Sequence, residues 1–192
     1  DVLAAWDRRT NVESRGAVLF SLWALGFAAS QPGGVYERPW SFAAPTQWPD
    51  GLADDAAAVS ALVATVESME AGGIPLDLPW GEFARSPDGA GGTLPSNLGM
   101  GSLGAFRVGF FEPNPAGGAP IFNGGTSWVA AIEFGEQVSA RAILPYGNFA
   151  VRPEGIEEQY SLFARGELRG VNFSEATVAA ATVFEERLGR GE

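Results

Sequence analysis

Three pairs of adjacent carboxylates come nearest, by type and spacing, to acid–base chemistry. They are Asp54–Asp55, Glu157–Glu158 and Glu185–Glu186. Two carboxyl groups held about 5–10 Å apart across a bond can act as acid and base, as in glycosidases. Each pair falls at an expected helix end, where carboxylates cap the helix or stay solvated. We therefore expect capping, and keep a carboxylate-based hydrolase only as a third hypothesis.

Most other catalytic groups are missing from the sequence. It contains no His, Cys or Lys. This excludes Ser-His-Asp and Cys-His catalysis, lysine Schiff bases, P-loop phosphate binding and zinc sites built on His or Cys. Disulfides are excluded too, so cysteine usage says nothing of the redox compartment. We identify no catalytic residue and expect no cofactor.

Two segments have a superficial likeness to binding loops. Asp50, Asp54 and Asp55 lack the spacing of a calcium loop, so we expect no metal site. Gly99–Gly104 is rich in glycine, but an expected strand follows it, so a turn is favoured over a dinucleotide loop. No Gly-x-Ser-x-Gly nucleophile elbow is present.

The segment from Gly124 to Gln159 is the most informative. Gly124, Gly125 and Gly147 are expected at turns or close backbone approaches. The amides of Asn148 and Gln159 can orient a substrate or a neighbouring loop, although such amides more often tie down their own loop. The sequence therefore leaves the substrate-binding residues unknown.

The composition is that of an acidic globular chain. Its 192 residues suffice for one domain with its own core, at 46% hydrophobic and 18% charged content. The net charge is −11 and the pI is near 4.4. The 12 basic residues are all Arg and are scattered along the sequence. Nucleic acid and anionic membranes are therefore not expected as partners.

Neither a membrane span nor a signal peptide is expected. Residues 16–29 are apolar but shorter than the roughly 20 residues that a transmembrane helix needs. The start, Asp1–Asp7, lacks a basic region followed by an apolar one. Such a start is typical of the interior of a longer polypeptide or of a processed end.

The first half is expected to be helical and irregular. Residues 12–29 are apolar on all sides, which predicts a buried helix, ended by Gln31–Gly34. Residues 35–53 predict an irregular, well-packed connection, with an acyl-binding wall as the alternative. The aromatic residues in and just before that connection are Phe27, Tyr36, Trp40, Phe42 and Trp48.

A second helix is predicted over residues 54–70. Asp54 or Asp55 can cap it, and Gly72–Gly73 stops it. The expected buried stripe is Val59, Leu62, Val63, Val66 and Met69. Residues 72–104 are rich in Gly, Pro and Ser and predict a long loop lying over a larger body.

The second half predicts strands and a final helix. Residues 105–111 suit a strand, and 127–134 with 138–145 suit an antiparallel pair joined by Gly135–Gln137. Both faces of the pair are apolar, so both are expected to be covered. A last helix is predicted from Ser174 to about Leu188, with Phe173 and Val178 as a hydrophobic staple.

The whole chain is expected to be one incomplete unit. Residues 1–104 form its mostly helical and irregular part, and residues 105–192 form its core strands and terminal helix. We see no boundary in the sequence that would leave two independent cores.

Five segments, taken in order, resemble the C-terminal part of the β-chain in penicillin amidase-family acylases. They are Trp6–Asp7 with Ser14–Phe20, Pro79–Gly81, Gly124–Val129, Ala142–Asn148, and Glu158–Gln159 with Leu162–Ala164. The family often has a Ser-x-His element before its Asp-Gln. Here Pro153–Glu157 stands there, without His.

The resemblance implies an α+β fold, the C-terminal portion of an αββα N-terminal-nucleophile sandwich. Its antiparallel strands would be covered by helices. The first residue of the family's β-chain attacks an amide, with its own α-amino group as base, and an asparagine helps form the oxyanion hole. The resemblance implies that these groups lie upstream of Asp1. The chain would supply scaffold and be inactive alone.

The implied activity of the whole protein is release of an acyl chain from an amine. Acyl-homoserine lactones, lipopeptides and β-lactams are candidate substrates, which would imply quorum quenching or antibiotic conversion. The implied partner is the autoproteolytically processed remainder of the acylase. The implied location is periplasmic or extracellular. The main rival is a non-catalytic α+β binding or structural module.

Overall fold

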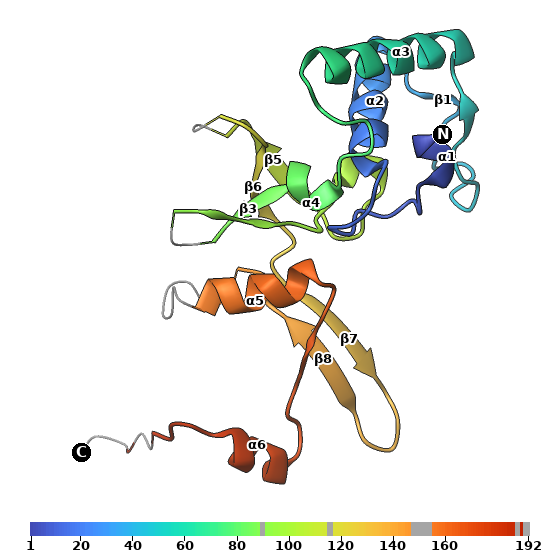
Figure 1. The fold of residues 1–192 in the computed structure, drawn as a ribbon. Coiled ribbons are helices and arrows are strands. Elements are labelled where there is room, and N and C mark those ends of the chain that lie inside the picture. Colours follow the sequence, from blue (N-terminus) through green and yellow to red (C-terminus); the bar gives the residue numbers. More distant parts are fainter. Residues whose placement is uncertain (89–90, 115–116, 147–154, 187–188, 190–192) are drawn as a thin grey trace. The chain divides into compact units, whose positions relative to one another are not determined.

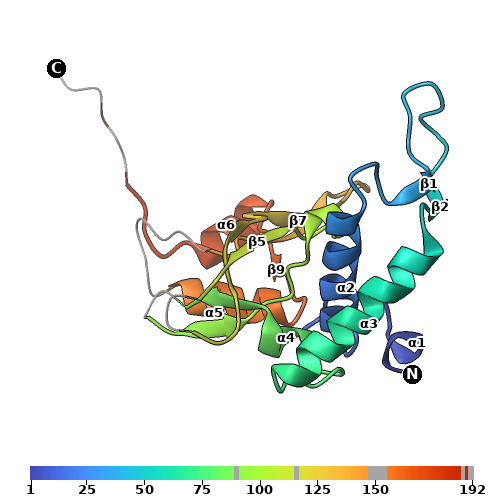
Figure 2. The ribbon, with the colours of Figure 1, turned by 90° about the horizontal axis from the view of Figure 1, so that it is seen from above.

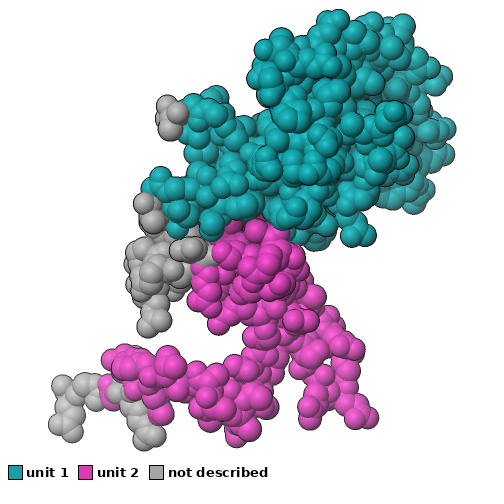
Figure 3. Space-filling view, in the orientation of Figure 1, with its two compact units in different colours: residues 1–126 teal, residues 127–192 magenta. Residues whose placement is uncertain are grey.

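The computed structural model describes residues 1–88, 91–114, 117–146, 155–186 and 189. The chain divides into two compact units, residues 1–126 and 127–192 (Figure 3). Helices and mostly antiparallel strands are mixed (Figure 1), which confirms the α+β class. The αββα layering and the organisation as one incomplete unit stay predictions.

The first unit contains two longer helices and two small sheets. Its elements are α1 (Val2–Ala5), α2 (Ala17–Ser30), β1 (Tyr36–Arg38), β2 (Asp50–Leu52), α3 (Asp55–Ala71), α4 (Trp80–Phe83), β3 (Arg85–Pro87), β4 (Thr93–Pro95), η1 (Gly101–Leu103), β5 (Gly109–Glu112) and β6 (Ile121–Gly125). Helix α3 packs against α2 (Figures 1 and 2).

Helix α2 begins five residues later than the sequence predicts. The amide of Ser14 donates to the carbonyl of Asn11 in a turn, and Gly16 has a φ of 99°. That left-handed conformation suits glycine and ends the preceding turn. Ala17, Val18 and Phe27 are buried on α2, but Leu25 is exposed. The expected burial on all sides is therefore wrong for one side of the helix.

Helix α3 begins and ends as predicted. The Asp54 carboxylate accepts from the amide of Ala57 at 2.9 Å, and Gly72 is the C-cap. The predicted stripe is only partly right. Met69 is buried, but Val59 is 62% exposed and Val63 also faces solvent. The helix packs through smaller residues instead, because α2 presents Gly26 to it.

Residues 35–53 are not a packed connection. Strands β1 and β2 pair antiparallel, with Tyr36 opposite Leu52. The loop between them projects from the body of the unit in Figure 2. Trp48 is 82% exposed and Phe42 is similarly solvated. The predicted packing is wrong in this chain because the hairpin holds its aromatic side chains away from the two helices.

Residues 72–104 are not a long covering loop either. They fold into α4, β3, β4 and η1. Trp80 and Leu98 are fully buried there. Proline and glycine suggested a loop, yet the segment supplies the centre of the first unit. The reason is that Trp80, within this segment, packs its ring against that of Phe122 from β6.

The larger sheet of the first unit has the strand order β4-β3-β6-β5. Strands β3 and β6 are parallel, and the other two pairs are antiparallel. Strand β5 begins at Gly109, so the predicted strand over 105–111 is shifted. The sequence analysis missed β6 because its -Asn-Gly-Gly ending is typical of a turn.

The second unit has a three-stranded sheet and two helices. Its elements are β7 (Val129–Glu133), β8 (Ser139–Ile143), α5 (Gly155–Ala164), β9 (Arg169–Gly170) and α6 (Glu175–Ala181). The antiparallel pairing of β7 with β8 is confirmed. The predicted covering is not met within the described chain, where Trp128, Ile132 and Phe134 are exposed.

Helix α6 starts as the sequence predicts. The Ser174 hydroxyl accepts from the amide of Thr177 at 3.1 Å. The helix ends at Ala181 rather than near residue 188. Phe173 and Val178, the expected staple pair, are both about half exposed.

Candidate functional site

The carboxylate pairs behave as ordinary surface groups where they are described. Asp54 caps α3, and Asp55 lies in the first turn of the same helix. This confirms the predicted capping. Glu158 on α5 is exposed, as are Glu185 and Glu186 beyond α6. The side chain of Glu157 lies outside the described residues.

The candidate cation ligands do not converge. Asp50 forms an ion pair with Arg38 at 3.1 Å instead. Within the described ranges, no group of three His, Cys, Asp or Glu could hold a metal ion. The described helices include none that is long and apolar enough to cross a membrane.

The backbone requires glycine at some of the predicted positions and not at others. Gly101–Leu103 forms a 3₁₀ turn closed by left-handed Gly104, which confirms the predicted turn. Gly125 has a φ of 142°, and a Cβ there would collide with the carbonyl of Val108. A Cβ on Gly124 would meet only Phe110 at 3.8 Å. Close approach is thus confirmed for Gly125.

Gly147 and Asn148, two of the residues singled out in the sequence, lie outside the described residues. Gln159 is on α5, in the second unit. It lines a shallow depression of about 370 Å³ together with Trp128, Arg169 and Asn172. That surface mixes apolar and amide groups. Its role in substrate binding stays a prediction.

Two of the sequence motifs are brought together at the centre of the first unit. The amide of Trp80 donates to the carbonyl of Ser14 at 2.9 Å, and the amide of Gly81 donates to the carbonyl of Val12 at 2.9 Å. The Ser14 hydroxyl donates to Asp7 Oδ1 at 3.1 Å. These bonds join the Trp-Asp segment to the Trp-Gly turn.

Glycine is required at this junction. A Cβ on Gly81 would lie 2.8 Å from Cβ of Val12. The Trp80 indole donates to the carbonyl of Leu98 at 2.8 Å, in the fully buried interior. Its ring lies 6.4 Å from that of Phe122. These bonds and ring contacts hold the junction together as a scaffold.

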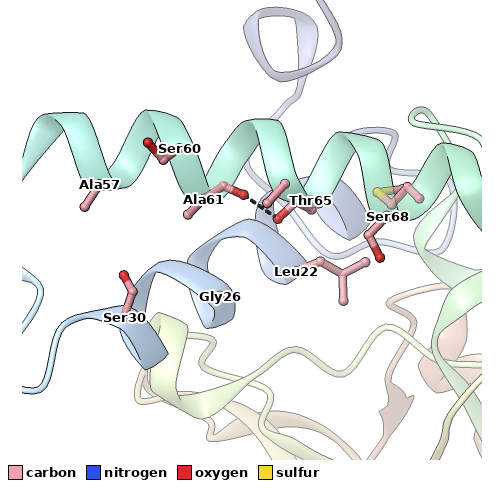
Figure 4. A pocket seen from close by; sticks show the side chains of 10 residues that line it. Leu22, Gly26, Ser30, Ala57, Ser60, Ala61, Thr65 and Ser68 are labelled. Carbon is pink, nitrogen blue, oxygen red and sulfur yellow. Dashed lines mark hydrogen bonds between the residues drawn. The ribbon is translucent and has the colours of Figure 1, made fainter.

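A groove of about 570 Å³ runs between α2 and α3 (Figure 4). Mostly small residues line it, among them Gly26, Ala57 and Ala61. The Thr65 hydroxyl in the groove donates to the carbonyl of Ala61 at 2.8 Å, the dashed line in Figure 4. In the part of the chain that the structure describes, no charged side chain lines it. The groove therefore reflects how α2 and α3 pack against each other.

Two tyrosines contact each other in the second unit. The rings of Tyr146 and Tyr160 have centroids 6.1 Å apart. Within the described part of the chain, the buried Tyr146 hydroxyl has no hydrogen-bond partner. Burial, assisted by the charge of Tyr160, raises the pKa of Tyr146 to about 12. The phenol therefore stays protonated at neutral pH.

The sequence analysis missed one gathering of charge. Arg8, Arg9 and Arg107 line a single pocket in the first unit, although the arginines are scattered in sequence. The adjacent pair Arg8–Arg9 next to Trp6 was the available signal. The third member is almost a hundred residues away in the chain, so no local pattern connects it to the pair.

The comparison with known families covers nearly the whole chain. The sequence model of the family described as penicillin amidase matches residues 1–180. That range includes the junction of the two Trp motifs, the sheet of the first unit, the β7–β8 pair, α5 and most of α6. The resemblance read from five short segments is therefore confirmed, and the chain belongs to the penicillin amidase family.

Proposed function

We propose that this chain is the C-terminal part of an acylase that cleaves linear amides. The whole protein releases an acyl chain from an amine, and an acyl-homoserine lactone, a lipopeptide or a β-lactam side chain is its substrate. The family match over residues 1–180 is the observation that carries this proposal. The chain's own role is scaffold, with the nucleophile on the remainder of the polypeptide.

The residue inventory supports this division of labour. Attack on an amide needs an activated nucleophile, and the chain has no Cys, His or Lys to supply or activate one. At its buried centre, the indole of Trp80 and the amides of Trp80 and Gly81 donate hydrogen bonds within the chain. An N-terminal Ser, Thr or Cys on another segment, with its own amine as base, completes the chemistry.

The exposed apolar residues of the second unit support a missing partner. Trp128, Ile132 and Phe134 lie on or beside β7 and are all exposed. Contiguous apolar patches larger than a few hundred Å² on soluble proteins usually mark interfaces. We assign this face to contact with the remainder of the acylase. The same family membership motivates a periplasmic or extracellular location.

The first experiment asks what copurifies with the chain. An affinity-tagged chain, expressed with its full open reading frame, should retain a second polypeptide that begins with Ser, Thr or Cys. Ile132→Asp places a charge in the proposed interface and should abolish retention. Val59→Asp, on the exposed face of α3, is the matched control and should retain the partner.

The second experiment measures hydrolysis. The complex should release free amine from an N-acyl substrate such as octanoyl-homoserine lactone, and the isolated chain should release none. Turnover by the isolated chain would overturn the assignment of the nucleophile to another segment. A monodisperse isolated chain that unfolds cooperatively and retains no partner would favour the rival, a free-standing binding module.

A further inference from the structure

The pocket lined by Arg8, Arg9 and Arg107 differs in charge from the rest of the chain. Its volume is about 470 Å³, within the usual range for small-molecule sites. Three of the chain's 12 arginines line it, and among the described residues no carboxylate does. The chain as a whole carries a net charge of −11. A local cluster of positive charge on such a background attracts and orients an anion.

A hydrogen bond holds the Arg107 side chain in place. Its Nη2 donates to Oδ1 of Asn11 at 3.2 Å, and both residues line the pocket. The side chain is partly buried, and burial lowers the pKa of its guanidinium from the ordinary value. The positioned, partly desolvated charge is therefore suited to bind a carboxylate.

Arg8 and Arg9 belong to the N-terminal segment that lines the pocket. In the part of the chain that the structure describes, neither side chain makes a hydrogen bond or an ion pair. The nearest carboxylate in sequence, Asp7, is engaged by the Ser14 hydroxyl and by the amide of Arg9. It does not line the pocket. Both guanidinium groups are thus available to a ligand.

The other lining residues are apolar or neutral. Trp6 and Phe20 have ring centroids 4.8 Å apart, and Met100 is almost fully buried beside them. Phe106 is 95% exposed at the rim. A pocket that combines guanidinium groups with aromatic rings fits a molecule with one anionic end and an apolar body.

We propose that this pocket of the first unit is a binding site for a small organic carboxylate with an apolar body. The carboxylate pairs with the guanidinium groups of Arg9 and Arg107, and the apolar body lies against Trp6 and Phe20. The proposal does not rest on the proposed acylase function. It stands on the lining residues and their charges alone.

The test uses 3-phenylpropanoate as probe and the neutral 3-phenylpropanamide as its matched control. The protein is the chain together with any polypeptide that copurifies, labelled with 5-fluorotryptophan. The ¹⁹F resonance of Trp6, assigned by Trp6→Phe, reports locally, because its indole N–H donates to the carbonyl of Arg9 at 2.9 Å. Binding at another site leaves this resonance unchanged.

The carboxylate should shift the Trp6 resonance with an affinity about 10-fold or more above that of the amide. Arg9→Gln and Arg107→Gln should each weaken binding about 10-fold. Arg38→Gln, whose side chain pairs with Asp50 outside the pocket, should leave it unchanged. Affinity should fall as salt rises, because the pairing is electrostatic.

Three results would overturn the proposal. The first is equal affinity for acid and amide, which removes the role of charge and requires no mutant to fold. The second is inorganic phosphate binding as tightly as 3-phenylpropanoate, which removes the role of the apolar body. The third is an unshifted Trp6 resonance at saturating probe. Hydrolytic activity enters none of these readouts, so a failure of the proposed acylase function remains distinguishable.

Discussion

Two tryptophans show that the two units differ in how far they bury their apolar side chains. Trp80 opens α4 and is fully buried, with its indole bonded to the carbonyl of Leu98. Trp128 precedes β7 and is 59% exposed. Both stand beside short apolar runs. The first meets covering strands from its own chain, whereas the second has no comparable cover in the described residues. Our proposal above assigns the covering of this β7 face to the remainder of the acylase.

The largest expected effect tests the self-sufficient side of this comparison. Trp80→Ala removes a fully buried ring and leaves a cavity beside Phe122. It also leaves the buried carbonyl of Leu98 without its hydrogen bond from the indole. The free energy of unfolding should fall by about 3–5 kcal/mol. Denaturant melts of the chain with its copurifying polypeptide measure this change.

The control for Trp80 is another tryptophan of the same unit. Trp48 is 82% exposed on the β1–β2 hairpin, so Trp48→Ala should change the unfolding free energy by no more than about 0.5 kcal/mol. Equal losses for the two variants would mean that Trp48 is covered in the assembled protein. The contrast between the buried centre and the open hairpin would then fail.

The next effect concerns the end of β6, where the first unit closes its sheet. Gly125→Ala introduces a Cβ at a φ of 142° and directs it at the carbonyl of Val108. Backbone must move, so the expected loss of stability is about 2–3 kcal/mol. The adjacent Gly124→Ala meets only an ordinary contact and should cost less than about 0.5 kcal/mol. Similar melts for both variants would show that β6 is not pinned here.

How far the sequence predicts the fold depends on the same distinction. The caps of α3 and α6, the β7–β8 pair and the turn at Gly101–Gly104 are local, and side-chain chemistry within a few residues determines them. Periodicity did not show that Val59 would face outward. Helix contact was decided by Gly26 on a separate element.

Non-local pairings account for the rest. Residues 72–104 contain no long periodic run, so their composition indicated a loop. Yet Trp80 is anchored by Ser14 from a distant part of the chain, and by Leu98, 18 residues away within the segment. The arginine pocket was missed for the same reason, because Arg107 joins Arg8 and Arg9 only through the fold. Family resemblance succeeded where periodicity failed, since ordered short motifs carry non-local information.

A smaller effect is expected in the second unit at Tyr146. Its buried hydroxyl has no partner in the described residues, so Tyr146→Phe should leave the unfolding free energy at pH 7 unchanged or raise it by up to about 1 kcal/mol. The half-exposed Tyr36 supplies the control, Tyr36→Phe, with no expected change. A clear loss of stability in Tyr146→Phe would place a bonding partner on the hydroxyl in the assembled protein.

The same residue predicts an alkaline transition. Burial raises the pKa of Tyr146 to about 12, above the ordinary value of 10.0. The unfolded chain therefore releases this proton first, so the folded state loses stability relative to the unfolded state as pH rises from about 10 toward 12. Melts across this range should fall less steeply for Tyr146→Phe than for the unaltered protein. Parallel pH profiles would contradict the raised pKa.

The smallest expected effect concerns backbone strain at Arg8, which lines the arginine pocket. Arg8 is the one non-glycine residue of the described chain with positive φ, at 60°. A left-handed conformation costs an L-residue roughly 1–2 kcal/mol, and glycine avoids this cost but loses roughly 0.5–1 kcal/mol more backbone entropy on folding. Arg8→Gly should therefore raise the unfolding free energy by about 0.5 kcal/mol, whereas Arg8→Val, β-branched at the same φ, should lower it by about 1–2 kcal/mol.

Arg9→Gly is the adjacent control, because Arg9 has no positive φ, and it should be neutral or slightly destabilising. If Arg8→Gly instead melts well below the unaltered protein, the Arg8 side chain makes contacts in the assembled protein that outweigh its strain, and the pocket is then occupied by the protein itself.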